Sequence, residues 1–137
     1  MKFNSQICTS RLQSERLLAL GLKPETADIV HYFSQSLAQD WTIVPLADGE
    51  TARYIQGLEI PAWSLDRLME LVPHRYGEYC DYANYFMYYY NIPLDVMEQF
   101  RGETRYEYLI DCIEWLIKQG YFNKEYLWND TNKCGKL

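Results

Sequence analysis

Apolar residues recur at helical spacing in two parts of the chain, and capping residues mark the ends of both. One apolar stripe follows Ser64, a residue type that favours the N-cap of a helix, and Pro73 ends it. A second stripe lies between the T-x-x-E capping box that begins at Thr104 and the glycine at Gly120. The pattern therefore predicts a short central helix and a longer amphipathic C-terminal helix.

The first forty residues show two shorter helical patterns. Ser10 and Gln13 can form a capping box, and Gly21 is a suitable residue to follow the helix that they begin. Pro24 suits the first turn of another helix, because its missing N–H costs nothing there. Four apolar residues then recur at helical spacing, namely Ile29, Val30, Phe33 and Leu37. Together these signals predict a helical hairpin.

The periodicity fails between Ala38 and Pro61, where proline and glycine interrupt the chain. This segment is expected to be an irregular connection with one short extended piece at residues 41–44. Residues 76–100 contain many aromatic residues and a stretch in which apolar and polar residues alternate. This pattern predicts a three-stranded antiparallel meander. Helices before and after one small sheet give an α+β fold. Its expected parts are the helical hairpin, the central short helix, the meander and the C-terminal amphipathic helix.

Composition changes this picture little but excludes several classes of protein. The 137 residues are 48% hydrophobic, which is enough for one core, so we expect a single compact α+β domain over residues 1–128. Residues 129–137 form an expected polar C-terminal tail. The formal charge of −6 comes without any run of lysine or arginine, which argues against nucleic acid as a partner.

The chain holds neither an apolar segment typical of a secretory signal nor a run long enough to span a bilayer. We therefore expect a cytoplasmic protein without a membrane partner. Four cysteines are scattered without a C-x-x-C pair, so they are interpreted as free thiols in a reducing compartment. No motif for a metal, a nucleotide or another cofactor is present, and none is expected.

Catalytic groups are few in this sequence. Cys80 with His74 and Asp81 is the most suggestive set, but Cys80 and Asp81 would point to opposite faces of a strand. His31 lies among apolar residues of the predicted hairpin, where a packed histidine is the simpler interpretation. We therefore predict no catalytic residues and no metal ligands.

The tyrosine-rich region holds the best candidate binding residues. If residues 85–90 form a strand, Tyr85, Met87 and Tyr89 share one face, and the other face is aromatic too. Three explanations for the second face stay open: tyrosines that half-cover an open sheet in water, a protein interface, or base stacking on single-stranded nucleic acid. Trp41 is a further candidate, as an exposed anchor or, by preference, a partly buried side chain.

Three blocks of the sequence occur in a distinctive order: TSRLQSERLLALGLKPETAD, then PAWSLDRLMELVP, then CIEWLIKQGYFNK. In this order they resemble a group of short uncharacterised proteins encoded by gut anaerobic bacteria, often within prophages or other mobile elements. The resemblance covers most of the chain and implies an α+β domain with a short meander before its last helix. It implies no established activity, and the density of tyrosines around residues 76–90 departs from the group.

The sequence thus predicts a non-enzymatic accessory or interaction protein of phage or mobile-element origin. It would bind a protein partner, or a second copy of itself, through an aromatic sheet face. The alternative is a small nucleic-acid-binding protein, or an enzyme whose site is assembled from residues distant in sequence.

Overall fold

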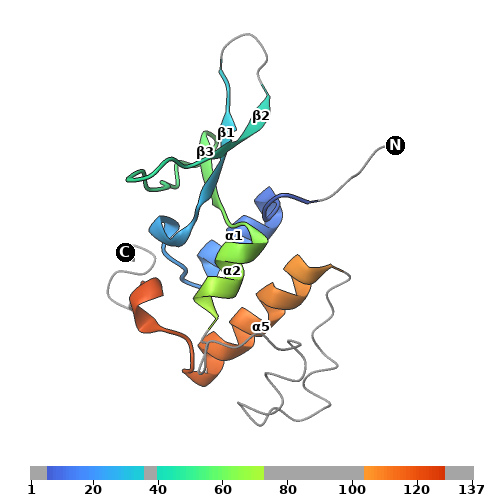
Figure 1. The fold of residues 1–137 in the computed structure, drawn as a ribbon, viewed down its shortest axis with the longest axis vertical. Coiled ribbons are helices and arrows are strands. Elements are labelled where there is room, and N and C mark those ends of the chain that lie inside the picture. Colours follow the sequence, from blue (N-terminus) through green and yellow to red (C-terminus); the bar gives the residue numbers. More distant parts are fainter. Residues whose placement is uncertain (1–5, 36–39, 73–103, 129–137) are drawn as a thin grey trace. The chain divides into compact units, whose positions relative to one another are not determined.

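The computed structural model describes residues 6–35, 40–72 and 104–128 (Figure 1). Within these residues the chain forms α-helices and one three-stranded antiparallel sheet. This combination confirms the predicted α+β fold class.

The chain divides into two compact units, Met1–Leu71 with Asn123–Leu137, and Val72–Phe122. Each unit is described by itself below. The expected single domain over residues 1–128 stays a prediction, and the expected tail at residues 129–137 lies outside the described residues.

Helix α1, Arg11–Ala19, begins and ends where the sequence predicts. The Ser10 hydroxyl accepts a hydrogen bond from the Gln13 backbone N–H at 3.1 Å, and the Gln13 side chain accepts one from the Ser10 N–H at 2.9 Å. This reciprocal cap satisfies two N–H groups that the helix itself cannot pair. Gly21 then turns the chain with φ at 105°, a conformation that only glycine adopts without strain.

The predicted second helix of the hairpin is wrong. Pro24–Thr26 form a single 3-10 turn, η1, and the chain then enters strand β1, Ile29–Phe33. Two β-branched residues begin this strand, and strands on both sides supply hydrogen-bond partners that local spacing does not reveal. His31 accordingly lies in the middle of a strand and not on a helix.

Strands β2, Trp41–Pro45, and β3, Glu59–Ala62, complete the sheet in the order β2-β1-β3, and both are antiparallel to β1. Strand β2 confirms the extended piece expected at residues 41–44, whereas β3 lies where an irregular segment was expected. The meander predicted in residues 76–100 lies outside the described residues. The sheet in the structure is therefore built earlier in the chain, with its first strand at the centre.

Helix α2, Leu65–Leu71, follows β3 closely in the chain (Figure 1), and Asp28 fixes the residue that caps its start. The Ser64 hydroxyl accepts a hydrogen bond from the Arg67 N–H at 3.1 Å, which confirms the predicted N-cap. Asp28 in turn accepts hydrogen bonds from the Ser64 backbone N–H at 2.9 Å and from its hydroxyl at 2.6 Å. The carboxylate therefore fixes the capping residue itself.

Trp63 is fully buried beside this cap, and its polar atoms are satisfied. Its indole N–H donates to the Thr26 hydroxyl at 3.0 Å, and its backbone exchanges two hydrogen bonds with Thr9 at 2.9 and 3.1 Å. We call this group the polar joint; its members are Thr9, Thr26, Asp28, Trp63 and Ser64. The polar joint connects the segment before α1, the turn η1 and the start of α2.

The last part of the first unit is the 3-10 turn η2, Lys124–Tyr126. The Lys23 N–H donates to the Tyr126 carbonyl at 2.9 Å, and the Trp128 N–H donates to the Gly21 carbonyl at 2.9 Å. These two bonds fix the segment after η2 beside the turn that follows α1.

In the second unit, helix α5, Arg105–Gln119, has the predicted ends. Thr104 Oγ1 accepts a hydrogen bond from the Glu107 N–H at 3.2 Å, and Gly120 ends the helix with φ at 80°. One face of α5 is buried: Tyr106, Leu109, Ile110, Cys112, Ile113 and Leu116. The apolar stripe read from the sequence is therefore confirmed as a buried face.

Candidate binding surfaces

Three of the four predicted binding residues, Tyr85, Met87 and Tyr89, lie outside the described residues. The catalytic set that was considered and set aside, Cys80 with His74 and Asp81, lies outside them as well. Trp41 is the one predicted site residue that the structure places.

Trp41 is half-buried at the start of β2, as preferred from the sequence. Its ring lies 5.3 Å from that of Phe33 between centroids, and the guanidinium carbon of Arg11 is 4.6 Å from the ring centroid. This arrangement is a cation–π contact from α1 onto the sheet. The contact holds Trp41 against the protein, so Trp41 forms part of a surface and is not a protruding anchor.

Around Trp41, the β1–β2 pair exposes apolar side chains on both faces of the sheet. Cross-strand pairing puts Ile43 and Trp41 on the face of His31 and Phe33, and puts Val44 on the face of Tyr32. Tyr32 and Ile43 are each 45% exposed and Val44 is 43% exposed. We call this group the hairpin surface; its members are Tyr32, Phe33, Trp41, Ile43 and Val44.

The free edge of β2 is closed to another strand. The Ser34 N–H donates to the Asp40 carbonyl, so residue 40 is hydrogen-bonded to the residue that follows β1. Every second residue of an antiparallel strand bonds to its partner, so the backbone groups of residues 41, 43 and 45 point away from β1, toward the free edge. Pro45 has no N–H, and the Trp41 N–H donates to the Asp40 carboxylate at 2.8 Å. Only Ile43 keeps an outward N–H, too few for a partner strand to add to this edge.

The opposite edge, β3, is closed in the same way. The Phe33 N–H donates to the Leu58 carbonyl, which turns residues 59 and 61 outward. Glu59 exchanges two backbone hydrogen bonds with Ile55, and Pro61 lacks a donor. Both edges therefore carry a proline at an outward position, and contacts to the sheet must come through its faces.

Cys8 and His31 bring a thiol and an imidazole into contact in the described part of the chain, with 3.9 Å between Sγ and Nε2. Nε2 also lies 2.7 Å from the Thr9 carbonyl, which can only accept, so Nε2 carries a proton. It cannot then take the proton of the thiol. Burial, with a smaller effect of the Asp28 charge, raises the pKa of Cys8 to about 11. The pair is a packing contact, not a catalytic dyad.

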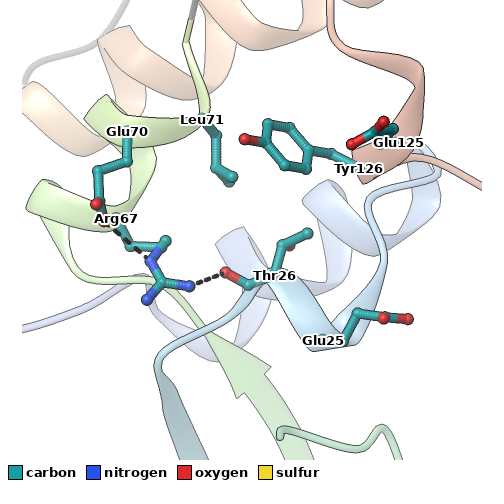
Figure 2. Close-up of a pocket in the computed structure, with 7 residues that line it drawn as sticks. All are labelled: Glu25, Thr26, Arg67, Glu70, Leu71, Glu125 and Tyr126. Atoms are coloured by element: carbon teal, nitrogen blue, oxygen red, sulfur yellow. Dashed lines mark hydrogen bonds and ion pairs between the residues drawn. The ribbon is translucent and has the colours of Figure 1, made fainter.

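One pocket of about 360 Å³ opens beside α2 and the two 3-10 turns (Figure 2). Its lining residues are Glu25, Thr26, Arg67, Glu70, Leu71, Glu125 and Tyr126. Arg67 donates from Nε to Glu70 at 3.1 Å and from Nη1 to the Thr26 carbonyl at 3.0 Å. Figure 2 shows this pair on one side of the opening, with Glu25 and Glu125 on the other.

Three glutamates against one arginine make this pocket acidic, which disfavours anionic ligands such as phosphates. Glu25 and Glu125 are exposed to solvent, so their field is screened. Arg67 is occupied in tying α2 to η1. The lining of the pocket therefore favours a cationic over an anionic ligand, and it indicates no particular class of ligand.

A second pocket, of about 470 Å³, lies beside α1. We call it the Trp128 pocket; its lining residues are Glu15, Leu18, Ala19, Leu22, Pro24, Tyr54 and Trp128. The Tyr54 hydroxyl donates to Glu15 at 3.5 Å, and burial together with the Glu15 charge raises the pKa of Tyr54. Tyr54 and Trp128 are 43% and 40% exposed, so both rings are accessible.

No group of three or more metal-ligating side chains occurs among the described residues. Within residues 6–35, 40–72 and 104–128, no helix is long and apolar enough to cross a bilayer. Comparisons with protein-family models, curated proteins and solved structures found no match.

Sequence reasoning missed the members of both surfaces other than Trp41. The sequence pattern places Tyr32 on a helix and Ile43 and Val44 in a short extended piece with no partner strand, so their alternation across a strand pair is not visible from it. Glu15 and Tyr54 are 39 residues apart and meet only in the fold. A usable signal was present at Pro45, since a proline after a β-branched run is typical of an edge strand.

Proposed function

We propose that this chain is a non-enzymatic interaction protein that binds another protein through the hairpin surface. The observation that supports this function is the exposure of Tyr32, Ile43 and Val44 on a sheet whose two edges are closed. Tyrosine and tryptophan are enriched among the few residues that supply most of the binding energy of protein interfaces. Closed edges leave face-to-face contact as the mode of binding.

The hairpin surface is suited to a protein partner more than to nucleic acid. A base-stacking surface normally lies in a basic groove, whereas the chain has a net charge of −6. Arg11, the cation that lies over Trp41, is already engaged with that ring. An accessory role in a phage or mobile element, in the cytoplasm, belongs to the same proposal and rests on the resemblance of three sequence blocks.

Site-specific photo-crosslinking tests the proposal in cells that carry the natural gene. A benzophenone amino acid replaces Tyr32, and a matched variant carries it at Leu12, which is 81% exposed on α1. We expect a discrete protein adduct from position 32 and none from position 12. Adding Val44→Asp to the first variant should remove the adduct, because it places a charge beside Tyr32 on the same face.

The size of the adduct distinguishes self-association from a different partner, and sedimentation of the purified chain over a concentration series checks the first case. Equal adducts from positions 12 and 32 would contradict the proposal, as would an adduct that survives Val44→Asp. A nucleic-acid adduct at position 32 would favour the alternative function.

A further inference from the structure

The Trp128 pocket has a chemical character that the hairpin surface lacks. Leu18, Ala19 and Pro24 give it an accessible apolar wall, Tyr54 and Trp128 contribute two aromatic rings, and Glu15 contributes a carboxylate. Its volume of about 470 Å³ lies within the range of about 300 to 1,000 Å³ typical of ligand sites. The combination fits a ligand with an aliphatic stem and a positive end.

The rings of this pocket lie where they can attract a cation. The Lys23 ammonium is 5.6 Å from the centroid of the Trp128 ring, so this ring already takes part in one cation–π contact. Lys23 is not among the lining residues, so it leaves the pocket itself unfilled. Glu15 accepts a hydrogen bond from Tyr54, and within the described part of the chain no cation is paired with it.

We propose that the Trp128 pocket binds a lysine or arginine side chain of a partner protein. The aliphatic stem would lie along Leu18 and Pro24, and the charged end would lie between the aromatic rings and Glu15. The pocket shares no residue with the hairpin surface. Loss of binding at one of the two therefore does not imply loss at the other.

The charge of the lining selects this occupant over two other cations. Glu15 is the one charged residue among the seven that line the pocket. A divalent metal ion needs several oxygen ligands, so one carboxylate is too few. A polyamine carries several charges spaced along its chain, whereas a single carboxylate matches a single charge at the end of an apolar stem.

Nuclear magnetic resonance of the indole N–H groups provides the test, with the Trp128 signal assigned by its loss in Trp128→Leu. The probe is Nα-acetyl-lysine amide, and Nα-acetyl-norleucine amide is its uncharged match. We expect a saturable shift of the Trp128 signal with the lysine probe, at millimolar concentration because a single side chain offers few contacts. The norleucine probe should bind at least about fivefold more weakly.

Two variants with the same net charge distinguish the effect of the carboxylate in the pocket from the effect of the net charge of the protein. Glu15→Gln should weaken binding of the lysine probe about fivefold, because it removes the carboxylate inside the pocket. Glu25→Gln, outside the pocket, should leave binding within about twofold of the parent. Trp128→Leu keeps the apolar wall and removes one aromatic ring, so the affinity of this variant for the lysine probe should also fall. Because the variant lacks the Trp128 signal, its affinity is measured from the shift of the Tyr54 ring signals.

Three results would overturn this inference. Equal binding of norleucine and lysine probes would make the pocket a purely apolar site. Equal losses in Glu15→Gln and Glu25→Gln would assign the effect to net charge alone. Tighter binding of spermidine than of the lysine probe would replace the protein side chain by a free polyamine.

Discussion

The polar joint and the hairpin surface both consist of residues from the first half of the chain, but the side chains of the first are buried or half-buried and several of the second are exposed. In the polar joint, Trp63 is fully buried and its indole N–H has a partner in Thr26. On the hairpin surface, the aromatic side chain of Tyr32 and the apolar side chain of Val44 are both exposed to solvent. The first region satisfies buried polar groups, and the second leaves apolar groups in water.

This difference separates stability from binding. A buried hydrogen-bonded group is costly to disturb, because the partner that remains is left without water. An exposed side chain contributes little to folding and is available to a partner. We therefore expect substitutions in the polar joint to lower the free energy of unfolding, and substitutions on the hairpin surface to change association alone.

The largest effect should follow Trp63→Ala. The substitution removes a fully buried indole and leaves the Thr26 hydroxyl without its donor. Loss of a buried aromatic side chain costs about 3 to 5 kcal/mol of unfolding free energy. Urea denaturation followed by circular dichroism measures it, and a loss below about 1 kcal/mol would show that the polar joint is not a stabilising centre.

A smaller loss should follow Asp28→Ala, which removes both acceptors of the Ser64 N–H and hydroxyl. Losing hydrogen bonds to a charged group at a helix start costs about 1.5 to 3 kcal/mol. Asp48→Ala is the matched control, because Asp48 is exposed in a turn. Equal melting temperatures for the two variants would mean that the carboxylate does not hold the cap.

The buried Cys8 thiol, which precedes Thr9 of the polar joint, gives the stability of the first unit a dependence on alkaline pH. Its pKa is about 11 in the folded protein against an ordinary value of 9.0, so the unfolded chain loses this proton first. The stabilisation is complete below pH 9 and decreases as the pH rises toward 11, by roughly 2 kcal/mol in all. Burial of the thiol is the main cause.

The Cys8→Ala variant tests this dependence, because it has no titrating group at position 8 and is compared with the parent protein. The difference in unfolding free energy between parent and variant should shrink from about pH 8 to about pH 10.5. Cys112 is also buried with a raised pKa, so both proteins keep part of the alkaline loss. A difference that is constant with pH would show that the Cys8 thiol titrates normally.

The helices could be predicted from the sequence because their ends are local. Ser10, Ser64, Thr104 and Gly120 each act within a few residues of their position, so the caps visible in the sequence are the caps in the structure. Their signals do not depend on the rest of the fold.

The strands could not be predicted in the same way, because their partners are distant. Residues 29–33 pair with 41–45 on one side and with 59–62 on the other, and this pairing decides against the helix that their spacing suggests. In the sequence alone, Pro45 indicates an interruption of the segment without periodicity, and Pro61 indicates its end. Their outward positions make them compatible with edge strands, a distinction that requires the sheet register.

The candidate surfaces follow the same division. Trp41 is a candidate from the sequence alone, because it is a tryptophan in a segment without clear periodicity. Tyr32 and Val44 share a face only through the cross-strand register, and Glu15 meets Tyr54 only through the fold. Binding surfaces assembled across elements therefore stay hidden until the pairing is known.

The smallest effect on folding should follow Ile43→Ser and Val44→Ser, one on each face of the hairpin surface. Both side chains are already exposed, so each substitution should change the unfolding free energy by no more than about 0.5 kcal/mol. The same urea denaturation measures it beside Asp28→Ala. A loss above about 1.5 kcal/mol for either variant would mean that its side chain is buried in solution, by another copy of the chain or by this one. Sedimentation of the parent distinguishes these cases, because burial by a second copy requires an association that weakens on dilution. The contrast between a region built for stability and a region left open for a partner depends on this result.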